Sequence, residues 1–235
     1  MTIADELTKS IFSLLFGTTR RNIDTLRQNC LAFVVTKPAP RRPGRPSVLD
    51  ARAVSVGALS LWTEHGFATT NWNDLAQATG VSTRTLLRHF SSRAEIAWLG
   101  VAPATDRLRA ALTGVADDKP PAVVIRTAIV ESVSRDPRIH ELAPDWLRLI
   151  SSEPELAAAA PRVYQPWIDT LSDYLARRYP GSPDPICRAL ATAYQSATLA
   201  ALIEWAEDGA DGDCTDSVDR MLRWMDVHLP ATEPG

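Results

Sequence analysis

The stretch that decides the fold is GFATTNWNDLAQATGVSTRTLLRHFSSRAEI, residues 66–96 of 235. Asn71 is of the residue type that caps helix N-termini, and Asp74 follows it at the spacing of a capping box. Gly80 then supplies a tight turn, and Ser82 is a second N-cap. The spacing predicts a short helix, a glycine-centred turn and a second short helix.

Helix, turn and short second helix together form a helix-turn-helix, which places its second helix in the major groove of DNA. We expect this second helix, the recognition helix, over Thr83–His89, with Leu86 facing the core. Hydroxyl and cationic side chains such as Arg88 suit base edges and phosphates. An apolar stripe predicts a preceding helix over Leu49–His65, and a fourth helix begins at Arg93.

Residues 66–96 resemble the signature of the tetracycline-repressor (TetR) family of transcriptional regulators in spacing, turn glycine, Gly-Val-Ser and terminal His-Phe. The resemblance covers residues 48–100. The family usually has tyrosine at Leu87, so one hydroxyl contact to phosphate is missing here, and Arg93 replaces a lysine. The resemblance implies base reading by Ser82, Thr83, Arg84 and Thr85, and phosphate contacts by Thr70, Asn71, His89 and Arg93.

The charge of the chain is unevenly distributed. The net charge is −3, but residues 37–93 carry eight Lys/Arg against three acids, and residues 94–235 carry 13 basic and 22 acidic residues. The first segment is suited to a polyanion. Residues 37–47, KPAPRRPGRPS, predict an extended basic arm that enters a minor groove, with a solvated linker as the alternative. The arm's arginines are Arg41, Arg42 and Arg45.

The segment before the arm, residues 1–36, holds two apolar clusters. This start does not resemble a signal peptide, because it carries Asp5 and Glu6 and its apolar core is short. Two interpretations stay open: translation from a GTG codon at Val34 or Val35, or a helical N-terminal extension.

Residues 101–229 predict longer helices separated by Pro, Gly and Asp, with a tail over residues 230–235. No run alternates with strand periodicity. The expected fold is all-α and TetR-like. It joins a three-helix DNA-binding domain at 48–100, with its helix-turn-helix at about 71–90, to a C-terminal domain of about five to six helices. The expected helices include Pro121–Ser134, Arg138–Ile150, Pro154–Tyr179, Asp184–Glu207 and Cys214–Leu229.

The resemblance also implies how the C-terminal domain works. The last two long helices would pair with those of a second copy, so that a homodimer reads a palindromic site. Residues 148–178 resemble the C-terminal domain of mycofactocin-system regulators, which implies a small-molecule effector of acyl-CoA-like chemistry. Arg148 and Arg162 are candidates for a CoA phosphate. The expected pocket residues, whose alternative role is core packing, are Trp98, Trp146, Leu149 and Trp167.

Other function classes find little support. Cys30, Cys187 and Cys214 lack metal or disulfide spacing, which fits free thiols in a reducing cytoplasm. No Walker, GxSxG, dinucleotide or HExxH motif occurs, and no uninterrupted apolar stretch approaches the length of a membrane span. We therefore predict a cytoplasmic, ligand-responsive regulator of double-stranded DNA, most commonly a repressor in this family, without metal, cofactor or catalysis. A helical interaction scaffold without DNA binding is the alternative.

Overall fold

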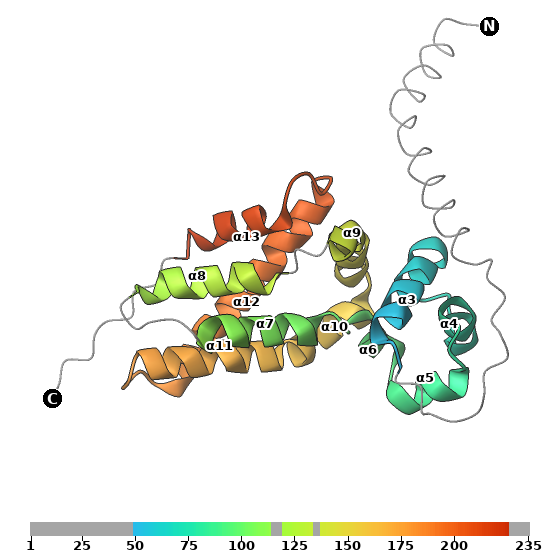
Figure 1. The fold of residues 1–235 in the computed structure, drawn as a ribbon, viewed down its shortest axis with the longest axis horizontal. Helices are drawn as coiled ribbons and strands as arrows, with labels where there is room; N and C mark the ends of the chain where they lie inside the picture. Colours follow the sequence, from blue (N-terminus) through green and yellow to red (C-terminus); the bar gives the residue numbers. More distant parts are fainter. Residues whose placement is uncertain (1–48, 114–118, 134–136, 226–235) are drawn as a thin grey trace, which may run out of the picture. The chain divides into compact units, whose positions relative to one another are not determined.

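The structure, a computed structural model, describes residues 49–113, 119–133 and 137–225 (Figure 1). Within these ranges the chain consists of helices and turns, and none of the described residues forms a strand. The predicted basic arm and N-terminal extension lie outside the described residues. The chain divides after Val48, and Leu49–Gly235 form one unit.

Four helices follow one another in the DNA-binding part: α3 (Ala51–His65), α4 (Trp72–Thr79), α5 (Thr83–His89) and α6 (Arg93–Ala97). The first begins two residues later than expected because the Asp50 carboxylate caps it, accepting hydrogen bonds of 3.1 Å from the backbone N–H groups of Arg52 and Ala53. α3 packs against α4 and α6, and α4 packs against α5.

Seven helices occupy the described residues from Val101 onward, against five to six expected. They are α7 (Val101–Thr113), α8 (Pro121–Ser132), α9 (Pro137–Ser152), α10 (Pro154–Val163), α11 (Gln165–Arg178), α12 (Asp184–Glu207) and α13 (Cys214–Leu222). α7, α8, α11, α12 and α13 run side by side, with α12 packed against both α11 and α13 (Figure 1).

The expected single helix over residues 154–179 is instead two helices that meet at Tyr164. The cause is Pro166, which lacks the N–H that a continuous helix would need there. The break places Pro166 in the first turn of α11, where backbone N–H groups have no helix partner. The last expected helix also differs, since α13 ends at Leu222.

The buried side chains form two clusters. One joins α3–α6 to α9, α10 and the end of α12, and contains Leu75, Leu86, Leu147 and Leu156. The other lies among α7, α8, α11, α12 and α13. Because each fully buried aliphatic or aromatic side chain contributes about 1.5–3 kcal/mol, the first cluster fixes the DNA-binding helices on the C-terminal helices.

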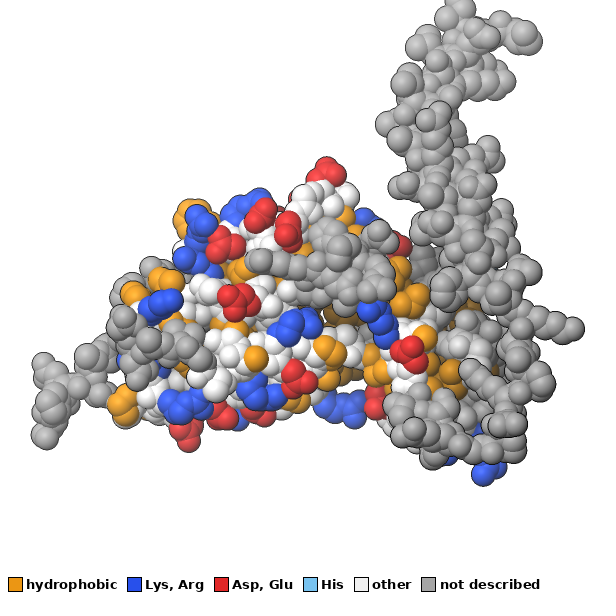
Figure 2. Space-filling model, viewed as in Figure 1, with side chains coloured by type: hydrophobic (Ala, Val, Ile, Leu, Met, Phe, Trp, Pro, Cys, Tyr) orange, Lys and Arg blue, Asp and Glu red, His pale blue; other side chains and the backbone are white. Residues whose placement is uncertain are grey.

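Two features of the surface bear on function. Lys/Arg and Asp/Glu side chains are interspersed over the visible face of the C-terminal helices (Figure 2). Arg188 of α12 pairs with Asp169 of α11 at 2.8 Å. α12 is long and apolar enough to meet the length and composition of a membrane span, with a mean hydropathy of 1.2 over 18 residues. Only 28% of that window is buried, so much of α12 lies at the surface of the described chain.

Candidate nucleic-acid interface

The capping pattern at the start of α4 forms as predicted. Asn71 Oδ1 accepts hydrogen bonds from the backbone N–H groups of Asn73 (2.8 Å) and Asp74 (3.3 Å). In return, the Asp74 carboxylate accepts one from the Asn71 N–H at 2.8 Å. Gly80 ends the helix with φ of 68°, a left-handed conformation that favours glycine. These local bonds set the direction in which α5 leaves the turn.

The hydroxyl groups at the start of α5 are engaged within the protein. Ser82 Oγ accepts the Thr85 N–H at 3.2 Å and lies 2.9 Å from Thr85 Oγ1. Thr83 Oγ1 donates to Asn73 Oδ1 at 3.1 Å, which ties α5 to α4. A hydroxyl oxygen keeps acceptor capacity after donating one bond, so these residues stay available as acceptors. Their reading of bases stays a prediction.

The remaining side chains of α5 divide between core and solvent. Leu86 is 0% exposed and Phe90 is also buried, as expected, and together they fix the helix orientation. Arg84, Arg88 and His89 are exposed, and Arg88 Nη2 lies 3.2 Å from His89 Nε2. Leu87 is 54% exposed on this same helix. α5 therefore presents two arginines, a histidine and one leucine outward.

Two predicted phosphate contacts are committed to the turn between α3 and α4. Thr70 is buried and its hydroxyl donates to the Phe67 carbonyl oxygen at 3.1 Å. Arg93 donates to the carbonyl oxygens of Phe67 (2.8 Å) and Thr70, and its guanidinium lies 4.6 Å from the centre of the Phe67 ring. Arg93 also approaches Glu155 of α10 at 3.9 Å. This internal role was not predicted from the sequence.

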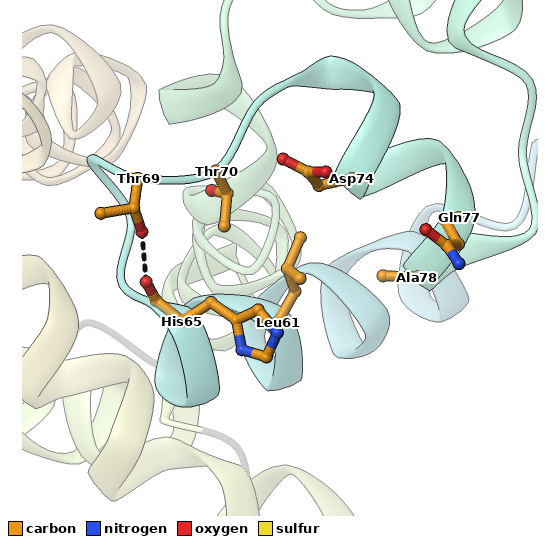
Figure 3. A pocket seen from close by; sticks show the side chains of 7 residues that line it. All are labelled: Leu61, His65, Thr69, Thr70, Asp74, Gln77 and Ala78. Atoms are coloured by element: carbon orange, nitrogen blue, oxygen red, sulfur yellow. Dashed lines mark hydrogen bonds between the residues drawn. The ribbon is translucent and has the colours of Figure 1, made fainter.

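An open groove of about 660 Å³ lies beside this turn, between the end of α3 and the outer side of α4 (Figure 3). The Thr69 hydroxyl closes one end by donating to the His65 carbonyl oxygen. The Asp74 carboxylate at the groove already serves the capping box. The groove was not predicted, and it lies in the DNA-binding part. Its lining residues are Leu61, His65, Thr69, Thr70, Asp74, Gln77 and Ala78.

The four residues expected to line an effector pocket do not all meet. Trp98 packs edge-to-face on Trp146, with ring centres 5.7 Å apart, and Leu149 packs against the same cluster. Trp167 belongs to the other cluster. Sequence reasoning missed Tyr164, which packs on Trp98 at 5.6 Å and whose pKa is raised by burial. Its signal would have been the helix break at this position.

Some polar groups near the aromatic cluster have hydrogen-bond partners and one does not. The Trp146 indole N–H donates to the Ala97 carbonyl oxygen at 2.6 Å, which joins α9 to α6. The buried Trp98 indole N–H has no hydrogen-bond partner among the described residues. Arg148, a candidate for a CoA phosphate, donates to the Ala206 carbonyl oxygen and pairs with Asp145 at 3.1 Å. Arg162 is exposed on α10.

Comparison with known proteins agrees with this geometry. Residues 56–97 match the family model described as bacterial regulatory proteins of the tetR family, and residues 119–230 match the model of the MftR C-terminal domain. The chain is 26% identical over 172 residues to a Mycobacterium tuberculosis protein named as the mycofactocin biosynthesis transcriptional regulator MftR. That match covers 73% of this chain and 87% of the relative.

Solved structures share the fold. The fatty acid degradation regulator FadR from Bacillus halodurans superposes with a TM-score of 0.54 at 15% identity, covering 74% of this chain and 96% of that one. NalD from Pseudomonas aeruginosa, the secondary repressor of a multidrug efflux pump, gives 0.51 at 20% identity, with 74% and 94% covered. Thermus thermophilus FadR, solved with lauroyl-CoA, gives 0.50 at 18% identity, with 79% and 99% covered.

The fold and the helix-turn-helix thus define a DNA-binding transcriptional regulator of the all-helical kind. Residues 56–97 are a DNA-binding domain of the tetR family, and residues 119–230 are a C-terminal domain of the MftR type. The predicted family and fold class are confirmed.

Proposed function

We propose that this regulator is a homodimeric repressor that reads a palindromic operator and leaves it when an acyl-CoA-like effector binds its C-terminal domain. The observation that carries the dimer is the outward face of α12. Ile186 is 45% exposed there, and exposed small residues follow it at alternating spacings of three and four. This stripe consists of Ile186, Ala189, Ala193, Ser196 and Ala200.

The stripe suits contact with a second copy of the same helix. Residues at this spacing share one side of a helix, and side chains as small as alanine let two helices approach closely. Trp224, just after α13, is 89% exposed, which adds a large apolar side chain near the end of the chain. Exposed apolar side chains of this kind suit an interface, and a twofold axis would cover them with the same face of a second copy.

A twofold dimer supports palindromic reading. Two copies of α5 related by a twofold axis reach half-sites about one DNA turn apart, so an inverted repeat in the operator mirrors the symmetry of the protein. The predicted contacts of α5, together with those of the basic arm, would be duplicated in the two half-sites. The proposal needs no catalytic step, and the protein would act on chromosomal DNA in the cytoplasm.

The effector proposal rests on the C-terminal domain. This domain matches that of MftR, and a protein of the same fold has been solved with lauroyl-CoA. Trp98, Trp146, Leu149 and Tyr164 form an apolar wall directly behind α6, the helix that follows the recognition helix. An acyl chain entering between this wall and the Trp167 cluster would move α6, and with it α5.

Two measurements test the proposal with the full chain. Light scattering after size-exclusion chromatography should give twice the mass of the 25.7 kDa chain. Selection of bound DNA from a random duplex library should yield an inverted repeat. Fluorescence anisotropy should then show that lauroyl-CoA releases the protein from this DNA. Free CoA is the matched control for the acyl chain. A monomer bound to a single half-site, or release by free CoA alone, would contradict the proposal.

A further inference from the structure

An exposed leucine lies on the DNA-reading surface of α5. Arg84, Leu87 and Arg88 are spaced i, i+3 and i+4, so their side chains share one face of the helix. Leu86, the neighbour of Leu87, is fully buried and prevents the helix from turning that face inward. Among the described residues, Leu87 is the large apolar side chain most exposed within the DNA-binding part.

The direction of the side chain places it towards the major groove. Side chains on a helix lean towards its N-terminus and cover the preceding turn. Leu87 therefore leans over the turn that carries Arg84, at the end of α5 that enters the groove in a helix-turn-helix. The flanking cations, Arg84 and Arg88, are both exposed and suited to DNA.

The chemistry of leucine restricts what it can contact there. It cannot donate to a phosphate, as a tyrosine at this position would. The hydroxyl groups beside it, those of Ser82, Thr83 and Thr85, keep acceptor capacity for base donors but offer no large apolar surface, which only Leu87 adds to this face. In the major groove the apolar group that a base presents is the 5-methyl of thymine.

We propose that Leu87 is a specificity-determining residue that contacts the 5-methyl group of a thymine in each half-site of the bound DNA. The contact removes apolar surface of both the leucine and the methyl from water, and it distinguishes thymine from the other three bases. A tyrosine at this position would bond to the phosphate backbone of the DNA, whereas the leucine contacts a base. The inference rests on DNA binding by α5 and on neither the effector nor the direction of regulation.

The test removes the methyl group from the DNA and the side chain from the protein in turn. The full chain, without effector, is titrated by anisotropy with its selected duplex, in which each thymine is replaced singly by deoxyuridine. Since one buried CH₂ or CH₃ group is worth roughly a three- to fivefold change in affinity, one thymine per half-site should show that loss. Leu87→Ala should bind the thymine duplex several-fold more weakly and should show no further loss with deoxyuridine at that position.

Three variants serve as controls. Val56→Ala shortens another exposed apolar side chain of the DNA-binding part and should leave every deoxyuridine response unchanged. Arg84→Ala should weaken binding while keeping the response to deoxyuridine. Leu87→Tyr, which offers a phosphate a hydroxyl donor in place of the branched apolar end, should lose the response to deoxyuridine.

Two outcomes would overturn the inference. One is an unexpected response to deoxyuridine. The wild type would lose no more than twofold in affinity with any replacement, or Leu87→Ala would keep the full response. The other is a loss of several degrees in the melting temperature of Leu87→Ala. That loss would mean that Leu87 packs against the chain itself or a second copy rather than DNA.

Discussion

Arg93 occupies a position where a cation is expected to meet a phosphate, yet its guanidinium serves the turn between α3 and α4. It donates to two carbonyl oxygens that follow the end of α3, lies over the Phe67 ring, and has a side chain only 19% exposed. A planar guanidinium can donate in several directions at once, whereas an ammonium cannot stack in this way. The arginine therefore holds α6 against the turn that starts the helix-turn-helix.

Arg93→Lys separates the internal role from a contact with phosphate. The charge and the N–H donors remain, but a lysine loses the planar group that lies over the Phe67 ring and the second nitrogen that approaches Glu155, so the free energy of unfolding should fall by about 1 kcal/mol. Urea denaturation measures this change, and the salt dependence of DNA binding should stay the same. Unchanged stability with a smaller salt slope would instead identify Arg93 as a phosphate ligand.

Asn71 allows a second test at this scale. Asn71→Ala removes the acceptor for the Asn73 and Asp74 N–H groups and should destabilise the protein by about 1 kcal/mol. Asn71→Asp, which keeps a capping oxygen, is the matched control and should retain most of that stability. If Asn71→Ala unfolds at the wild-type urea concentration but binds DNA more weakly, the side chain acts on DNA directly rather than as a cap.

At the scale of elements, the short helices were the easiest to predict. Asn71, Gly80 and Ser82 act on residues two to four positions away, so their caps and turn could be inferred from sequence alone. Residues 154–179 could not, because alanine-rich periodicity continues through Tyr164 while Pro166 interrupts the hydrogen-bond pattern. The partner of Arg93 was also out of reach, since Phe67 lies 26 residues earlier in the chain.

Adjacent leucines on α5 provide a test of how this element is held. Leu86→Ala leaves a cavity in the first cluster and should cost about 2–5 kcal/mol, whereas Leu87→Ala should change stability by less than about 0.5 kcal/mol. Guanidinium denaturation measures the free energy of unfolding of both variants, and its dependence on denaturant concentration should stay the same. Equal losses in both would show that α5 packs differently from this structure.

At the scale of the whole molecule, the dimer that we propose depends on a surface that one copy leaves exposed. α12 packs against α9, α11 and α13, and the stripe on its outer side consists of Ile186 followed by exposed alanines and one serine. The alanines were visible in the sequence, and the structure supplies which of them point outward. The aromatic cluster was only partly predictable, because Trp167 faces the other core from Trp98.

Ala193→Arg tests the stripe directly. A large cation in the middle of a helix pair cannot be buried without a partner, so the variant should elute as a monomer and bind the full palindrome at least tenfold more weakly. Ala158→Arg, which changes another exposed alanine, on α10, is the matched control and should behave as the wild type. A dimeric Ala193→Arg would place the interface elsewhere.

The basic arm gives a prediction that stands on the sequence alone. Replacing Arg41, Arg42 and Arg45 by alanine should flatten the plot of log K against log salt concentration by up to about 0.9 for each phosphate that the arm no longer neutralises. The base preferences of the selected DNA within the major-groove half-site should remain. A slope identical to that of the wild type would assign the arm to a solvated linker.

The first core cluster has a consequence for engineering. Leu75 and Leu86 of the DNA-reading helices share it with Leu147 and Leu156 of α9 and α10, and Trp146 bonds to the end of α6. A DNA-binding part cut at residue 100 and grafted onto a foreign sensor would therefore lose the side chains of this cluster that the later helices supply. Chimeric regulators built from this chain need a junction that transplants α9 and α10 along with the DNA-binding part, or a sensor whose matching side chains are redesigned to receive it.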